Sequence, residues 1–231
     1  MGSTEKPVGI VGFGDLGGKL AAWLNEAGFR VVVFDPHKSS PFEQAKSLND
    51  LSGQVDTIHW CAPLEALDEL SVLIHDQTLI LHASVMSLSA AAKQRLRGKG
   101  LNSGNIDIVH LLMNKHKSAV ISSDSDTISI ATEHLQRIGR QPRILHTKEH
   151  DRMMAISQAP MAILHELILD ELEVLQEKEL LTPSAEELLA AIQARAAKWT
   201  PVTMQAILQN PEIKPFIEDM LHLTQKKHSR T

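Results

Sequence analysis

A glycine-rich segment near the amino terminus constrains the fold more than any other feature of this sequence. Residues 12–17 read Gly-Phe-Gly-Asp-Leu-Gly, and they follow a short apolar run at residues 8–11. The residues after the segment carry apolar side chains at helical spacing. The segment therefore predicts a strand, a tight turn and a helix. In such a unit Gly12 permits the turn, Gly14 lets a diphosphate approach the backbone, and Gly17 allows the helix to pack against the strand.

An acidic residue after the second strand sharpens this prediction. The β-branched run at residues 29–34 ends at Asp35, about 20 residues beyond Gly14, where dinucleotide-binding units carry an acid for the adenosine ribose. A carboxylate there repels a 2′-phosphate, so we expect NAD rather than NADP. The predicted cofactor site consists of Gly12, Gly14, Asp15, Leu16, Gly17, Asp35, Ala62 and Pro63. The alternative is that the glycines only form a tight turn and that Asp35 only starts the turn at Pro36.

Further short strands alternate with helical stretches up to residue 147. They are expected at residues 57–60, 78–81, 106–111, 119–122 and 143–146. Such alternation predicts an α/β fold with a Rossmann-type, mostly parallel sheet covered on both faces. We therefore place a dinucleotide-binding domain at residues 1–147.

After residue 147 the strand pattern gives way to helical patterns alone. A long helix is expected over residues 149–178 with a kink at Pro160, and the next helix is expected to begin with a capping box of Ser184 and Glu187. This predicts an all-helical domain at residues 148–231. Because amphipathic helices of this length bury little surface alone, we expect the domain to pack against a second copy in a homodimer.

Composition excludes several other classes of protein. The net charge is −5, Lys and Arg are scattered, and aromatic residues make up 3% of the chain, which argues against a nucleic-acid partner. No apolar run approaches the roughly 20 residues of a membrane span, so no membrane partner is expected. The single cysteine, Cys61, is expected to be buried, which fits a reducing cytoplasm. No ligand-spaced pair predicts a metal site.

Three segments beyond the glycine turn carry a family resemblance. Residues 110–118 (HLLMNKHKS) resemble the His-Pro-Met-x-Gly-x-x-Lys-Ser segment of prephenate and arogenate dehydrogenases. Residues 149–161 (EHDRMMAISQAPM) are similar to the Glu-His-Asp helix that opens the helical dimerisation domain of that family. Residues 82–86 (HASVM) occupy the place of its Asp-x-x-Ser-Val-Lys segment. The likeness runs from residue 8 to about residue 165.

The resemblance implies a small-molecule substrate and an oxidative decarboxylation, in which the ring hydroxyl of prephenate or a close analogue loses its proton and hydride passes to NAD. It implies His110 as general base, because histidine titrates near neutrality, and Ser84 as the group that steadies His110 and the hydroxyl. The implied substrate-binding residues are Lys117, Ser118, Gln158 and Gln205.

This chain also departs from the family pattern. Leu111 replaces the proline after the histidine, Met161 replaces a histidine, and Gln205 stands where the family has an arginine that holds a substrate carboxylate. Arg152 and Arg195 are the candidates to replace that arginine. These departures leave two alternatives: a hydroxyacid dehydrogenase of the β-hydroxyacid type with another substrate, or an inactive NAD-binding homologue. The helix after residue 148 offers no lysine before Lys178, which disfavours the first alternative.

Overall fold

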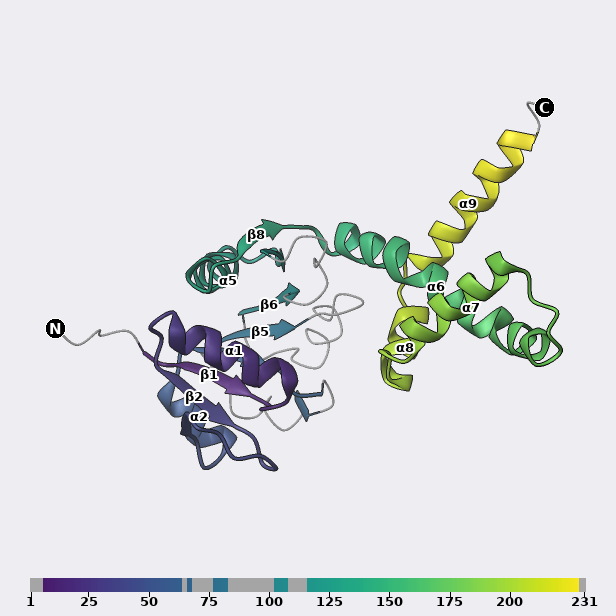
Figure 1. Ribbon diagram of the computed structural model, residues 1–231. Helices are drawn as coiled ribbons and strands as arrows, with labels where there is room; N and C mark the ends of the chain where they lie inside the picture. The colour runs from purple at the N-terminus through teal and green to yellow at the C-terminus, as the bar shows by residue number, and fades with distance from the viewer. Residues whose placement is uncertain (1–5, 64–65, 68–76, 83–101, 108–115, 229–231) are drawn as a thin grey trace. The chain divides into compact units, whose positions relative to one another are not determined.

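The computed structural model describes residues 6–63, 66–67, 77–82, 102–107 and 116–228. The chain divides into two compact units, residues 1–147 and residues 148–231. The first is an α/β unit and the second is helical (Figure 1). No helix among the described residues is both long and apolar enough to cross a membrane.

One sheet organises the α/β unit. Its described strands follow the order β3-β2-β1-β4-β5-β6-β7-β8 across the sheet. Their bounds are β1 Val8–Val11, β2 Val31–Phe34, β3 Glu43–Gln44, β4 Thr57–Trp60, β5 Thr78–His82, β6 Asn102–Asp107, β7 Lys117–Ile121 and β8 Gln141–Ile144. All neighbouring strands are parallel except β6 and β7, which are antiparallel. The strand order and the parallel pairing confirm the predicted Rossmann-type fold.

Helices cover both faces of this sheet. On one face, α1 (Asp15–Glu26) and α5 (Ser125–Arg137) pack against alternate residues of β1, β2 and β5. On the other face, α2 (Leu48–Gln54) packs against Val11, Ile58 and Trp60. Because the central strands are buried on both faces, their sequences are continuous apolar runs rather than alternating ones.

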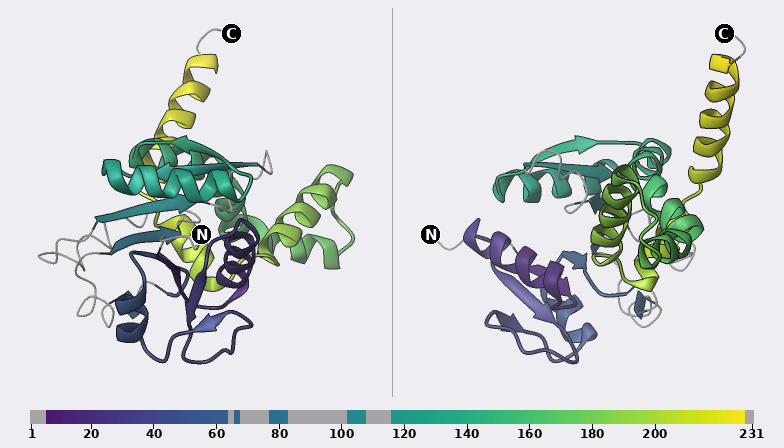
Figure 2. Two further views of the ribbon diagram at one scale, coloured as in Figure 1. Left: turned by 90° about the vertical axis from the view of Figure 1, so that its left-hand side faces the viewer. Right: turned by 45° about the vertical axis from the view of Figure 1, so that its right-hand side comes forward.

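The helical unit contains α6 (Thr147–Glu177), α7 (Pro183–Ala196), α8 (Pro201–Leu208) and α9 (Ile213–His228) (Figure 2). Helix α6 continues through Pro160 as one element. The predicted Ser184–Glu187 capping box is wrong, because α7 begins earlier: the Thr182 hydroxyl accepts from the Ala185 amide and Pro183 occupies the first turn. Proline there loses no intrahelical hydrogen bond, which favours this earlier start.

Two strand predictions also need correction. The sixth strand begins at Asn102, four residues before the predicted start at residue 106, and β3 was not predicted. The predicted part beyond Asp107 lies outside the described residues. The prediction followed the apolar residues, whereas the sequence of β6 is polar. A Cβ at Gly104 would lie 2.5 Å from Cγ2 of Thr127 and 3.0 Å from Cβ of Ser122. Close approach to α5, rather than apolar content, therefore explains the glycine in this strand.

Candidate functional site

The three glycines of the turn between β1 and α1 meet three different surroundings. Gly12 has φ +90°, and a Cβ on it would lie 2.8 Å from the backbone nitrogen of Ala62. A Cβ on Gly17 would overlap the carbonyl oxygen of Gly12. At Gly14, by contrast, no atom of the described chain lies within 4 Å of the Cβ position. Two of the glycines therefore close the turn against its neighbours, and the third leaves open space beside the backbone.

The open space at Gly14 adjoins the amino terminus of α1. Gly14 is the N-cap residue, and no side chain of the described residues caps the helix there. The amide N–H groups of the first helical turn, which includes Asp15 and Leu16, have no intrahelical acceptor, and the helix dipole adds positive potential at this end. An uncapped helix terminus beside a glycine is suited to a phosphate group.

Asp35 lies beside the same turn. Its Oδ2 accepts from the amide of Phe13 at 2.6 Å, and its Oδ1 accepts from the amides of His37 and Lys38 at 2.8 and 3.0 Å. Burial by itself would raise the pKa of Asp35, but these backbone hydrogen bonds and the nearby His37 together hold its pKa below the usual value. The carboxylate is therefore ionised at neutral pH and is fixed between the glycine turn and the end of β2.

The segment after β4 forms the other wall of the turn. The amide of Cys61 donates to the carbonyl of Val11 at 2.8 Å, and Nε1 of Trp60 donates to the carbonyl of Pro63 at 3.2 Å. Ala62 and Pro63 are thus held next to Gly12, while their contact with a cofactor stays a prediction. Cys61 is partly buried rather than fully buried as predicted, and desolvation raises the pKa of its thiol to about 12, which keeps the thiol protonated.

The predicted substrate residues of β7 lie at the edge where the parallel strands end. Because β7 runs antiparallel to β6, with Asp107 opposite Ala119, its first residues lie beyond the carboxyl end of β6. Lys117 is partly exposed, and Ser118 is fully buried with its Oγ 3.4 Å from Nη1 of Arg140. The predicted catalytic residues His110 and Ser84 lie outside the described residues.

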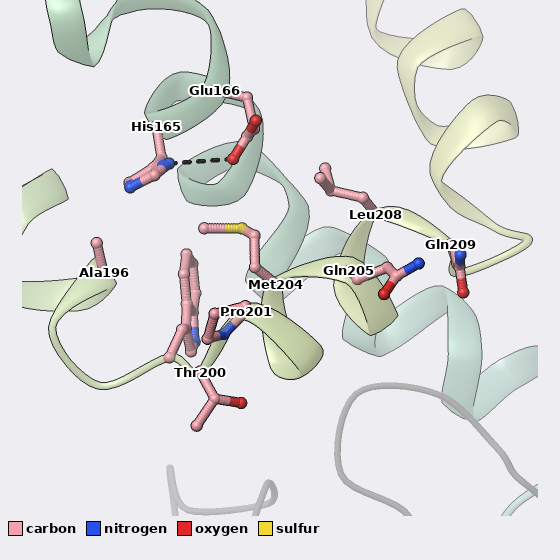
Figure 3. A pocket seen from close by; sticks show the side chains of 10 residues that line it. His165, Glu166, Ala196, Thr200, Pro201, Met204, Gln205, Leu208 and Gln209 are labelled. Carbon is pink, nitrogen blue, oxygen red and sulfur yellow. Dashed lines mark hydrogen bonds and ion pairs between the residues drawn. The ribbon is translucent and has the colours of Figure 1, made fainter.

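The two predicted glutamines of the helical unit have different surroundings. Gln158 on α6 is buried, and its Oε1 accepts from Nη2 of Arg195 on α7 at 2.7 Å. Gln205 on α8 lines a pocket with a volume of about 680 Å³. Figure 3 shows Gln205 and Gln209 on one side of this pocket and the His165–Glu166 pair from α6 on another. The structure therefore brings Gln205 into a cavity that Gln158 does not line.

The structure also shows what the two candidate arginines contact. Arg195 pairs with Gln158 and lies over the ring of Trp199 at 5.4 Å from the ring centroid. Arg152 forms an ion pair with Asp219 of α9 and lies over the ring of Phe216. Neither arginine lines the pocket of Gln205.

Sequence reasoning missed two groups of polar side chains. One is the pocket wall of His165 and Glu166 in α6, whose helical pattern carries no mark that separates it from a solvated face. The other is a row of three hydrogen-bonded histidines in the α/β unit: His82, His59 and His134. A histidine inside the apolar run of β4 was the available sign of this row.

Comparisons of sequence match the first part of the α/β unit. The model for the NAD-binding domain of D-isomer specific 2-hydroxyacid dehydrogenases matches residues 2–84, in agreement with the predicted cofactor. Erythronate-4-phosphate dehydrogenase of Proteus mirabilis is 41% identical over 63 residues, which are 26% of this chain and 17% of that protein. The chain thus spans a small part of the length of this curated relative.

Comparisons of structure extend over both units. Prephenate dehydrogenase from A. aeolicus, solved with hydroxyphenyl propionate and NAD⁺, superposes with a TM-score of 0.69 at 17% identity, over 100% of this chain and 93% of that one. A putative prephenate dehydrogenase from Corynebacterium glutamicum gives 0.70 at 16% identity, over 97% and 81%. Synechocystis arogenate dehydrogenase gives 0.66 at 14% identity, over 96% and 93%. The chain therefore has the fold of these dehydrogenases, which confirms the resemblance at the level of the fold.

Proposed function

We propose that this protein is an NAD-dependent oxidoreductase that oxidises the ring hydroxyl of prephenate, arogenate or a related cyclohexadienyl acid, with loss of carbon dioxide. The observation that carries the proposal is the uncapped amino terminus of α1 beside the ionised carboxylate of Asp35. The match of residues 2–84 to an NAD-binding domain and the fold shared with prephenate and arogenate dehydrogenases support it.

The residues of the α/β unit fit NAD. The open space at Gly14 would admit the diphosphate, which a Cβ on this residue would obstruct. The amides of the first turn of α1 would hold the diphosphate oxygens. The Asp35 carboxylate has lone pairs beyond those taken by its three backbone donors, and these would accept from the ribose hydroxyls. When bound, NAD supplies the hydride acceptor.

The remaining roles follow the family resemblance. His110 takes the proton of the substrate hydroxyl, and Ser84 orients His110. The resemblance also assigns substrate contacts to Lys117 and Ser118 of β7 and to Gln158 and Gln205 of the helical unit. An amide in place of an arginine favours a substrate with less negative charge at that point, because a neutral group cannot form a charge-assisted pair with a carboxylate.

We further propose a homodimer formed through the helical unit. Helix α9 exposes Met220 and Leu221, and α6 exposes Leu167 and Val174. Exposed apolar side chains on neighbouring helices of one unit are characteristic of a surface that a second copy covers.

A second candidate function is the oxidation of a different hydroxy acid. The observation that favours it is that the matched domain model and the matched curated relative both belong to hydroxyacid dehydrogenases with other substrates. Both candidates use the same cofactor site, so the substrate distinguishes them.

Binding and turnover assays test these proposals in sequence. Calorimetry with NAD and with NADP should show tighter binding of NAD; absence of a saturable response to either coenzyme would contradict the cofactor site. NADH formation is then measured with prephenate, arogenate, 2-hydroxy acids and 4-phosphoerythronate. Turnover with the first two supports the leading proposal, turnover with the others supports the second, and NAD binding without turnover supports an inactive homologue.

His110→Asn should lower kcat by about 10²- to 10⁴-fold while NAD affinity holds.

A further inference from the structure

Three histidine side chains form a hydrogen-bonded row inside the α/β unit. Nδ1 of His59 lies 3.2 Å from Nε2 of His82, and Nε2 of His59 lies 2.9 Å from Nδ1 of His134. The ring centroids are 5.4 and 5.2 Å apart. The proposed function assigns no role to any of these rings.

The row lies between the sheet and α5. In β5, His82 faces the same way as Ile80, which packs in the cluster with α1 and α5. In β4, His59 alternates with Ile58 and Trp60, which pack against α2 on the opposite face. His134 completes the row from α5, and both His59 and His134 are buried. Residues from three elements therefore meet in a place where solvent does not supply hydrogen bonds.

The chemistry of neutral imidazole gives such a row a direction. Each neutral ring has one N–H donor and one acceptor nitrogen, and His59 uses both of its nitrogens. It therefore donates to one neighbour and accepts from the other. When a proton enters at one end of the row and another leaves at the far end, every hydrogen bond reverses and no ring retains a charge. The rings must turn back before a second passage in the same direction.

The two ends of the row lie at opposite edges of the sheet. His82 is the last residue of β5, at the edge where the parallel strands end and where the glycine turn lies. His134 lines a surface pocket of about 150 Å³ together with residues at the starts of β1 and β4. The charged members of this pocket are Lys6, Asp56 and Glu133. The pocket gives the row an outlet to water at the amino edge.

The surroundings oppose a charge that stays on the row. Burial, followed by the neighbouring rings of His134 and His82, lowers the pKa of His59 well below its usual value. Burial, followed by the positive charge of Arg137, lowers the pKa of His134 to about 4. The rings therefore rest in the neutral form, which the directional row requires.

We propose that His82, His59 and His134 conduct protons between the carboxyl edge of the sheet and the pocket at its amino edge. The use of this path rests on the proposed function. Oxidation of a hydroxyl group breaks a C–H and an O–H bond; the hydride goes to the nicotinamide, and the proton must leave the site. In the relay His82 takes up that proton, His82 passes one to His59, His59 passes one to His134, and His134 releases one to water in the pocket.

Nuclear magnetic resonance of the ¹⁵N-labelled full chain without cofactor or substrate tests the conduction itself. The quantity measured is exchange of the His59 ring N–H with water, relative to the backbone amides of Ile58 and Ile80 on the same strands. A working path predicts a protection factor at least about 100-fold lower for the ring proton than for these amides, because the proton leaves without the strands opening. Equal protection of ring and amides would overturn the proposal.

A variant at the outlet makes the test specific. His134→Gln keeps a hydrogen-bonding side chain but cannot pass a proton, so exchange at His59 should slow at least about tenfold while the strand amides keep their protection. His37→Gln, at an exposed histidine of the same unit, is the matched control and should leave ring exchange at His59 unchanged. Unchanged exchange in His134→Gln would overturn the proposal. Should that variant not fold, the wild type decides: exchange through the path leaves the ring proton less protected than the strand amides, whereas exchange by unfolding protects them equally.

Kinetics separates this proposal from the proposed function. If the enzyme turns over, His59→Gln should lower kcat about tenfold without altering NAD affinity, and added imidazole, which can take the proton at the carboxyl edge, should restore most of the loss. A structural defect would not respond to imidazole, so a lack of rescue would contradict a catalytic use of the row. A chain that binds no NAD overturns the proposed function and leaves the exchange measurement valid.

Discussion

The two units of the molecule differ in how their side chains find partners. In the α/β unit, polar side chains are held by internal hydrogen bonds: Asp35 by three backbone amides, and the buried His59 by two other rings. In the helical unit, apolar side chains are left on the surface. Among the described residues, nine of the ten large apolar side chains that are exposed lie there, and Ile144 is the exception. The described part of the first unit buries nearly all of its large apolar side chains, whereas the second exposes a surface that the proposed dimer would cover.

The difference shows where substitutions should act. A change inside the α/β unit disturbs a fixed geometry and should appear in stability or cofactor affinity. A change on the surface of the helical unit should appear in assembly.

The largest effect is expected from Gly17→Ala. Its Cβ would overlap the Gly12 carbonyl oxygen, which belongs to the backbone and cannot move without displacing the turn. We expect a loss of about 3 kcal/mol in the free energy of unfolding, typical of severe overpacking. Gly14→Ala is the matched control: its Cβ faces open space, so stability should hold while NAD affinity falls. Urea titration and calorimetry measure the two quantities, and equal stability of both variants would contradict the assigned geometry.

Acidification should lower the free energy of unfolding of the α/β unit by an amount similar to that expected for Gly17→Ala. Both His59 and His134 have folded pKa values below the unfolded value of 6.5, about 4 for His134. The unfolded chain therefore binds more protons below pH 6.5, so stability is complete above that pH and is lost as pH falls toward 4. For His134 alone the loss is roughly 3 kcal/mol at pH 4. Hydrogen exchange of the β4 and β5 amides between pH 7 and pH 5 follows it, and His134→Gln should flatten the pH dependence.

A charge introduced on the helical unit should weaken the proposed dimer, whereas a charge introduced on the α/β unit should not. Met220→Glu places a carboxylate on the exposed apolar surface of α9, and burying it in an interface is costly. We expect the dissociation constant of the proposed dimer to rise at least about tenfold, or by roughly 1.4 kcal/mol or more. Ile144→Glu, at the exposed apolar residue of the α/β unit, is the control and should leave the constant unchanged. Analytical ultracentrifugation that shows a wild-type monomer would refute the comparison between the units.

The smallest effect is expected at the cofactor. Asp35→Asn keeps the side-chain shape but removes the charge that favours ribose hydroxyls over a 2′-phosphate. We expect NAD affinity to fall about tenfold and the preference over NADP to narrow, since charge-assisted hydrogen bonds are about twice as strong as neutral ones. Asp50→Asn, at a partly exposed aspartate of α2 whose pKa is also lowered, is the control and should bind both coenzymes as the wild type does. Tighter NADP binding by the wild type would remove Asp35 from its assigned role.

The sequence predicted the parts of the fold that depend on local pattern. The bounds of β1 and β4 were predicted to the residue, because their apolar runs are bounded by turn residues. The polar strand β6 was misplaced, because a glycine that accommodates Thr127 depends on a tertiary contact. The glycine turn and Asp35 lie within one local pattern of the sequence, so they could be assigned in advance. The histidine row could not be predicted, because its members come from three separate elements.

The raised pKa of the Cys61 thiol has a practical consequence. A thiol with a pKa of about 12 stays protonated at pH 8, and alkylating reagents attack the thiolate. Maleimide should therefore leave the native protein unmodified, and one cysteine introduced on each unit would be labelled without removing the natural one. The chain is thus ready for distance measurements by fluorescence between its two units as coenzyme is added.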